Sequence, residues 1–247
     1  MVAFALWLYF GAYTTNPNNY KTIGDVKTPY GYSRIPAQSN DFVSYIRTIP
    51  LKEKGTKIHL YTGGEANLQN LGYAVLDLPL LSNSEQCADC CIRLRAEHLY
   101  ATHQYSRIAF SDVNGVKQKY TGGNSRPAFE KYLKRVYGVA STYSLRQEMN
   151  NRKLSEIQPG DVFVYAAIDR PGNKYGHAVM VADVAENEDG ERVFLLVEGN
   201  TPARDMHLMR NWRNLWFSPW FYVDEDAETF RLSAFKFKSN ELKYWGE

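Results

Sequence analysis

The sequence has few cysteines, no strong net charge and no long apolar run. Its 247 residues include three cysteines, and all of them fall within residues 87–91. Cysteines this close together cannot form the bridges between distant segments that a disulfide framework needs. The net charge is only +2, and its basic residues are interleaved with acids, so no electrostatic footprint for nucleic acid is visible. We therefore expect neither a disulfide-stapled fold nor a nucleic-acid partner.

The apolar stretch at residues 3–11 is too short to span a bilayer. It is typical of the apolar region of a signal peptide, although only Met1 and Val2 precede it; a buried N-terminal strand is the alternative. We expect residues 1–22 to be a signal-like segment and linker. The protein is then exported, periplasmic or associated with the cell envelope, without a stable membrane span in the mature chain, and its oligomeric state is left open. Exported proteins usually lack idle thiols, so at least one cysteine should have a use.

The sequence does contain enough apolar residues, 44%, to form a substantial core. Before Gly160 the periodicity favours helices, at residues 39–49, 82–105, 126–137 and 144–151. Ser82 and Glu85 are spaced to form a capping box for the second of these. After Gly160 three apolar strands follow, at residues 162–168, 177–184 and 192–198, with a turn at 187–190. This order predicts an α+β fold with an antiparallel sheet.

We expect an N-terminal α/β extension over residues 23–80 and a main domain over residues 81–247. These two parts should form one compact unit. The main domain should carry an inserted helical segment at about residues 106–155.

Cys87 falls in the first turn of the strongest predicted helix. Free N–H groups and the helix dipole lower the pKa of a thiol at that position. Cys90 and Cys91 lie further into the helix, where this effect fades. Gln86 immediately precedes Cys87, and its amide can donate a hydrogen bond to a developing oxyanion. The pattern predicts Cys87 as the nucleophile.

His177 begins a predicted strand, and two polar residues end the strand expected to pair with it. These are Glu198 and Asn200, which strand alternation places on one face. Thiol catalysis needs a base beside the nucleophile and a third group that orients the base. We therefore predict His177 as the base, oriented by Glu198 or Asn200. Taken singly, a cysteine on an apolar helix face is more often a core residue.

Four short blocks in this chain order resemble the CHAP family of cysteine- and histidine-dependent amidohydrolases and peptidases, relatives of the NlpC-type cell-wall hydrolases. The blocks are residues 86–87 (QC), 158–162 (QPGDV), 175–181 (YGHAVMV) and 198–200 (EGN). The resemblance implies a papain-like core, in which a helix bearing Cys87 packs on an antiparallel sheet bearing His177 and Glu198/Asn200. It also implies a thioester mechanism without a cofactor, acting on a peptide or peptidoglycan-like substrate.

The chain departs from the CHAP pattern in two places. Asp89, Cys90 and Cys91 replace the aromatic residues expected soon after the nucleophile, and the interval from Cys87 to Gly160 is long. The chain also resembles a family of bacterial exported proteins without an assigned activity, through residues 93–97 (RLRAE) and 218–220 (SPW).

Several other hypotheses compete with catalysis. A catalytically inactive papain-like binding or scaffold protein at the cell envelope would have a buried thiol, or His177 out of reach. A redox pair of Cys87 and Cys90 lacks a thioredoxin-like context. A zinc site would need ligands around the metal that one continuous helix cannot supply.

Some other polar and aromatic residues have less specific roles in these hypotheses. His59 and His207 show no partners, and His98 and His103 are interpreted as helix-face residues. The tryptophans at 212, 216 and 220 are expected to line a substrate groove.

Overall fold

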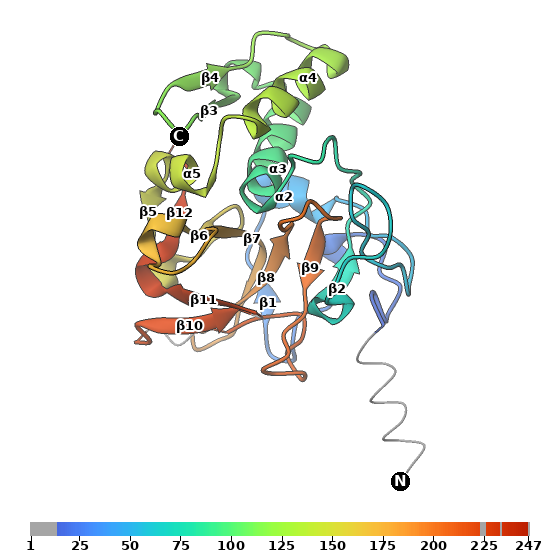
Figure 1. Ribbon diagram of the computed structural model, residues 1–247. Coiled ribbons are helices and arrows are strands. Elements are labelled where there is room, and N and C mark those ends of the chain that lie inside the picture. Colours follow the sequence, from blue (N-terminus) through green and yellow to red (C-terminus); the bar gives the residue numbers. More distant parts are fainter. Residues whose placement is uncertain (1–13, 223–225, 233, 247) are drawn as a thin grey trace.

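The computed structural model describes residues 14–222, 226–232 and 234–246. These residues form an eight-stranded sheet in the order β2-β9-β8-β7-β6-β12-β5, with β1 paired to β7 (Figure 1). Every pairing in it is antiparallel. The fold is therefore α+β with an antiparallel sheet, as the sequence predicted. The apolar run at residues 3–11 lies outside the described residues.

The elements of the described chain fall into one large sheet, two hairpins and a set of helices. The sheet consists of β1 Ser33–Arg34, β2 Gly72–Val75, β5 Asn150–Asn151, β6 Val162–Tyr165, β7 His177–Glu186, β8 Arg192–Glu198, β9 His207–Met209 and β12 Leu242–Tyr244. The hairpins pair β3 Ala109–Ser111 with β4 Lys117–Lys119, and β10 Thr229–Leu232 with β11 Phe235–Lys238. The α-helices are α2 Phe42–Arg47, α3 Cys87–Ala101, α4 Arg126–Tyr137 and α5 Thr142–Glu148. Short 3₁₀ turns occupy Ile23–Asp25, Gln69–Leu71, Tyr105–Arg107, Leu154–Glu156, Ala167–Asp169 and Ser239–Glu241.

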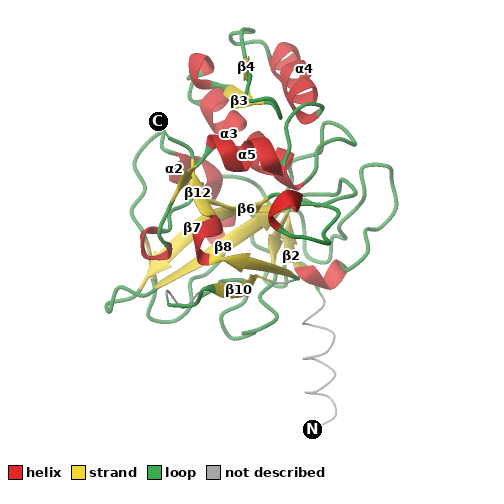
Figure 2. Cartoon of the chain, turned by 60° about the vertical axis from the view of Figure 1, so that its left-hand side comes forward, coloured by secondary structure: helices red, strands yellow, loops and turns green. Residues whose placement is uncertain are grey.

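The central strand β7 is covered on both faces. Ala178 and Met180 belong to the core that the helices share, whereas Val179 and Val181 belong to a second core with the β10–β11 hairpin. Figure 2 shows α3 and α5 above the sheet and β10 below it. A strand buried on both faces is a continuous apolar run in the sequence. Such runs are why the sequence predicted β7 and β8 well.

The helix α3 begins at Cys87, later than the sequence predicted. Its N-cap is Gln86, whose N–H donates to Asp89 Oδ2 at 3.0 Å. The predicted capping box of Ser82 and Glu85 is wrong, because Glu85 accepts the N–H of Leu81 at 2.7 Å instead. Cys87 is consequently the first helical residue, where N–H groups have no acceptor within the helix.

The predicted insert, residues 106–155, contains β3, β4, α4, α5 and β5. Figure 1 shows β3, β4 and α4 together at the end of α3, on the side of the molecule away from the β10–β11 hairpin. Residues 23–80 and 81–247 both contribute to the larger core, for example Ile46 and Leu76 beside Leu94 and Met180. The division of the chain into those two parts remains a prediction. No helix in the described ranges combines the length and the apolarity needed to cross a membrane.

Candidate active site

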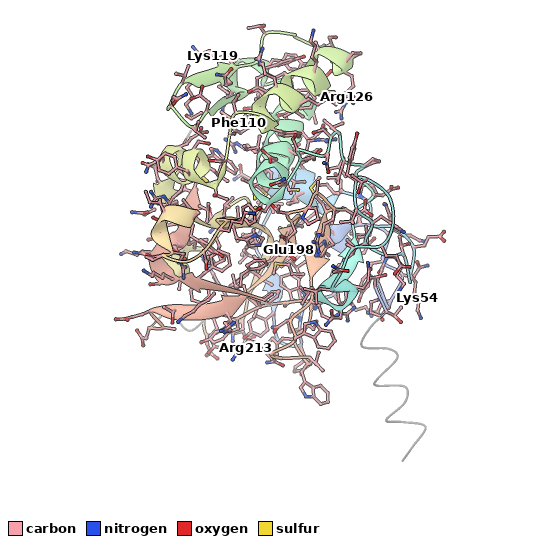
Figure 3. The ribbon with its side chains drawn as sticks, in the orientation of Figure 1. Lys54, Phe110, Lys119, Arg126, Glu198 and Arg213 are labelled. Atoms are coloured by element: carbon pink, nitrogen blue, oxygen red, sulfur yellow. The ribbon has the colours of Figure 1, made fainter. Side chains whose placement is uncertain are left out.

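A row of three polar side chains crosses three adjacent strands at one end of the sheet. His177 is the first residue of β7, Glu198 is the last of β8, and His207 is the first of β9. Glu198 Oε2 lies 3.3 Å from His177 Nε2, and Glu198 Oε1 lies 3.2 Å from His207 Nε2. All three side chains are buried, and Figure 3 shows Glu198 in the interior of the molecule. One carboxylate therefore joins two imidazoles.

Cys87 meets this row from the N-terminus of α3. Its thiol hydrogen-bonds to the imidazole of His177 and receives the N–H groups of Ala88 and Ala178. Because Nε2 of His177 faces Glu198, Nδ1 is the ring nitrogen left for the sulfur. A helix start and two strand ends thus place a thiol, an imidazole and a carboxylate in line, which is the arrangement that activates a nucleophile.

The electrostatics of this line favour a thiolate and an imidazolium. Burial raises the pKa of Cys87, but the hydrogen bond and charge of His177 outweigh burial and hold this pKa below its ordinary value. Burial lowers the pKa of His177, whereas its bonds to Cys87 and Glu198 raise it to about 9. Since the two groups titrate as a coupled pair, both directions express one fact: the proton resides on the imidazole.

The second histidine of the row, His207, has a hydrogen-bond acceptor facing each of its ring nitrogens. Burial raises the pKa of Glu198, but hydrogen bonds from His177 and His207 lower it to about 2, so this carboxylate is ionised at neutral pH. His207 Nε2 faces that carboxylate, and Nδ1 faces the carbonyl oxygen of Asp205 at 3.0 Å. Neither of these partners can donate, so a ring nitrogen of His207 that carries a proton always has an acceptor in front of it. Glu198 therefore lies between the imidazole rings of His177 and His207.

The remaining predicted site residues, Gln86 and Asn200, lie on either side of Thr201. Gln86 Oε1 accepts the hydroxyl of Thr201 at 2.8 Å, which leaves the amide NH₂ as a donor beside Cys87. Asn200 Oδ1 accepts the N–H of Thr201 at 2.7 Å. Of the two orienting groups that the sequence left open, the structure thus places Glu198 at His177. The free N–H of Cys87 and the amide of Gln86 are the donors available for an oxyanion.

The other two cysteines pack in the interior. Burial raises the pKa of Cys90 and of Cys91 well above that of an ordinary thiol. Gly199 is required by this packing, because a Cβ there would overlap Cys90 Sγ. Gly176 is required in the same way, since a Cβ there would overlap Thr142 Oγ1. Two glycines that flank the site residues therefore serve close packing.

Two cavities meet at the cysteine and the histidine. One, of about 480 Å³, is lined by Cys87 and Gln86, and the other, of about 380 Å³, by His177 and Asn200. They share the wall formed by Tyr175, Gly176 and Thr201. Cys87 is only 6% exposed and His177 2%. The approach to the sulfur is consequently narrow.

Sequence reasoning missed His207, which was expected to have no partner. Its strand, β9, is three residues long, and so short a strand has no periodicity to detect. The expectation for the tryptophans is wrong: Trp212, Trp216 and Trp220 line neither cavity. Trp220 is instead buried and donates its indole N–H to the carbonyl of Lys27 at 2.7 Å.

Of the two histidines interpreted as helix-face residues, His98 lies in α3, whereas His103 lies beyond the end of that helix. His98 Nε2 lies 3.0 Å from the carbonyl oxygen of Asn40, and His103 Nδ1 lies 2.6 Å from the hydroxyl of Tyr105. Within the part of the chain that the structure describes, no three His, Cys, Asp or Glu side chains are grouped so that they could hold a metal ion.

A family model described as "Domain of unknown function (4846)" matches residues 24–124 and 121–244 of the chain. No curated protein and no solved structure matches the chain. The matched ranges contain all of the row described above, together with Cys87.

Proposed function

We propose that this chain, which belongs to the DUF4846 family, is a cysteine-dependent hydrolase that cleaves an amide bond. The single observation that supports this most is the line of hydrogen bonds from Cys87 through His177 to Glu198. It combines a thiol of lowered pKa, a protonated base and an orienting carboxylate at the junction of two cavities. A structural cysteine has no need of such partners.

The proposed reaction follows from these positions. The Cys87 thiolate attacks the carbonyl carbon of the amide, and the oxyanion accepts hydrogen bonds from the N–H of Cys87 and the amide of Gln86. The C–N bond then breaks as the imidazolium of His177 transfers its proton to the leaving nitrogen. A water molecule, deprotonated by His177, attacks the resulting thioester and releases the carboxylic acid. The thiolate and the imidazolium are restored, and one water has been consumed.

The proposal extends to fold and location through the resemblance to the CHAP family. The helix that bears the thiol, packed on the antiparallel sheet that bears the imidazole, suits a papain-like core. Residues 3–11 favour export to the cell envelope, where a cell-wall peptide is the proposed substrate. This last step rests on family analogy alone.

An inactive binding or scaffold protein is the second candidate, and the shielding of His177 favours it. The ring of Phe235 stacks on the imidazole of His177 with centroids 3.5 Å apart. Together with the low exposure of Cys87, this contact restricts access to the two reacting groups. The two candidates differ in whether a small reagent reaches an activated sulfur.

The rate of iodoacetamide labelling of each cysteine, followed by mass spectrometry from pH 4 to pH 10, tests the proposal. We expect Cys87 to react at a constant rate well below pH 8, because its thiolate persists there. In His177→Ala this fast reaction should disappear. Cys90 and Cys91 are internal controls that stay unlabelled, since burial keeps them as thiols.

If Cys87 reacts no faster than Cys90 and Cys91 in the folded wild-type protein, the hydrolase proposal fails and the scaffold stands. If Cys87 is activated, turnover follows from amine release across a library of peptides and amides. Cys87→Ser is the matched control for turnover, because it keeps the hydrogen bonding and loses the strong nucleophile.

A further inference from the structure

The two cavities that meet at Cys87 and His177 differ in charge. The described walls of the cavity on the cysteine side include two acidic groups, the thiol of Cys87 and the carboxyl of Asp89, and no basic side chain. On the histidine side, the described walls include four cationic side chains and no acidic one: Arg170, Lys174, Arg231 and Lys236. The junction is therefore a boundary between a neutral to acidic cavity and a basic one.

The basic cavity carries more positive charge than the fold itself requires. Arg170 is held by Glu241, with N···O distances of 2.6 and 2.8 Å, so its charge is compensated. Lys174, Arg231 and Lys236 are exposed. Arg231 and Lys236 lie directly opposite each other in the β10–β11 hairpin. Like charges at directly opposed positions destabilise a strand pair, and an anion bound beside them would offset this repulsion.

The proposed reaction determines which half of the substrate each cavity receives. The acyl half of an amide stays bonded to Cys87 and needs the oxyanion donors, which line the first cavity. The amine half must lie beside His177, because that imidazole protonates the leaving nitrogen. The basic cavity is lined by His177 and not by Cys87, so it receives the amine half.

We infer that this protein selects amides whose amine half carries a carboxylate, such as an amino acid or a short acidic peptide, and that Arg231, Lys236 and Lys174 recognise that carboxylate. This inference rests on the proposed function and adds the substrate class. Phe235, which stacks on His177, and Asn200 supply an apolar and a polar wall around the same half.

Two matched alkylating reagents test the inference without knowledge of the natural acyl group. N-(iodoacetyl)glycine carries a carboxylate, and N-(iodoacetyl)glycinamide replaces it by a neutral amide of similar size. In both, the thiolate of Cys87 displaces iodide and forms a thioether. Rates are divided by those of glutathione with the same reagent, which removes differences in intrinsic reactivity. N-(iodoacetyl)ethylenediamine serves as the cationic counterpart.

In the wild type we expect the carboxylate reagent to label Cys87 about tenfold faster than the neutral one at low salt, a typical size for electrostatic attraction into a charged cleft. The preference should shrink toward one in 0.5 M NaCl because of screening. It should also vanish in the double variant Arg231→Gln, Lys236→Gln. Lys119→Gln, which removes one positive charge from the β3–β4 hairpin at the far end of the molecule (Figures 1 and 3), should keep it.

A charge reversal separates recognition from loss of the hairpin. In Arg231→Glu, Lys236→Glu the cationic reagent should become the fastest, whereas a merely unfolded hairpin would show no preference of either sign. Equal rates for the carboxylate and neutral reagents in a wild type whose Cys87 reacts rapidly would overturn the inference and leave the hydrolase proposal intact. A Cys87 that reacts with no reagent would overturn both.

Discussion

Glu198 and His207 are directly opposed across β8 and β9, and the carboxylate Oε1 of Glu198 lies 3.2 Å from His207 Nε2. Because the other oxygen of the same carboxylate faces His177, His207 is linked to the proposed base through Glu198. The hydrogen bond from His207 stabilises the ionised carboxylate and so weakens its pull on the proton of His177. His207 is thus a positioning residue that tunes the base without touching the sulfur.

Nitrogen-15 NMR of histidine-labelled protein checks this link through Glu198. In His207→Leu the pKa of His177 should rise by on the order of one unit above its wild-type value, because Glu198 has lost a hydrogen-bond donor and pulls more strongly on the proton of His177. An unchanged pKa of His177 in this variant would mean that His207 does not tune the base.

Glu198→Gln and Asn200→Ala distinguish the two orienting groups that the sequence left open. The first removes the charge that raises the pKa of His177, so iodoacetamide labelling of Cys87 at pH 6 should fall roughly tenfold, equivalent to about one unit of pKa. The second removes a side chain that bonds the neighbouring N–H of Thr201, and labelling should change less than twofold. The opposite order of effects would make Asn200 the third residue.

The pH dependence of stability reports the ion pair between Cys87 and His177. The raised pKa of His177 contributes stability that is fully present below its unfolded value of 6.5 and is lost as the pH rises through about 9. The lowered pKa of Cys87 contributes stability that is fully present above its unfolded value of 9.0 and is lost as the pH falls. Between 6.5 and 9 the two slopes cancel, because the folded and unfolded pairs each hold one proton.

Urea unfolding of the wild type and of Cys87→Ser measures this contribution, since other titrating groups cancel in the difference. The difference in free energy of unfolding should rise up to about pH 6.5 and stay level from there through about pH 9, where the folded and unfolded pairs lose their remaining proton together. A difference that does not vary with pH would indicate a neutral thiol beside a neutral imidazole.

Gly199→Ala should destabilise the protein by about 1–3 kcal/mol, the usual range for an overpacked core. The added Cβ would overlap Cys90 Sγ, while its other nearest neighbours are at ordinary contact distance. The double variant Gly199→Ala, Cys90→Ala should recover most of the loss, because it removes that sulfur. Urea unfolding of the four proteins gives the coupling energy directly, and additive losses would show that the two residues do not compete for space.

Arg93→Met should reduce the free energy of unfolding by about 3–5 kcal/mol, as expected when one partner of a buried ion pair is removed. Arg93 is buried and bonds Glu97 at 2.6 Å and Glu85 at 3.3 Å. Arg126→Met is the matched control, because Arg126 also bonds Glu97 at 2.6 Å but its side chain is 43% exposed. Its removal should reduce stability by about 1 kcal/mol or less. Equal losses in the two variants would contradict a role of burial.

The segment at residues 93–97 that resembled a family of exported proteins therefore serves a buried ion-pair network in α3. The sequence could not distinguish this role from a functional one. Helical periodicity predicts which residues share a face, but it does not predict which charged side chains from other segments contact that face. The partner of that network on α4, Arg126, lies 29 residues away from Glu97 along the chain.

The sequence by itself determined the strands around the candidate site and indicated two of the residues that meet there. Continuous apolar runs predicted β7 and β8, since both strands are buried on both faces, and the turn between them predicted their antiparallel pairing. The same register brought the end of β8 to the start of β7, and hence Glu198 to His177. Its position close to a predicted helix start was enough to make Cys87 the candidate nucleophile, even though the predicted cap was wrong.

Tertiary structure alone decided the partners that arrive from segments without a local pattern. His207 belongs to a three-residue strand, and two residues of the basic wall, Arg231 and Lys236, come from the β10–β11 hairpin, which no periodicity connects to His177. The tertiary structure also gives Glu85 a partner one helical segment away, since Arg93 of α3 bonds its carboxylate at 3.3 Å. Local propensity acts over a few residues, whereas the charge and shape of a site depend on which distant side chains packing brings together.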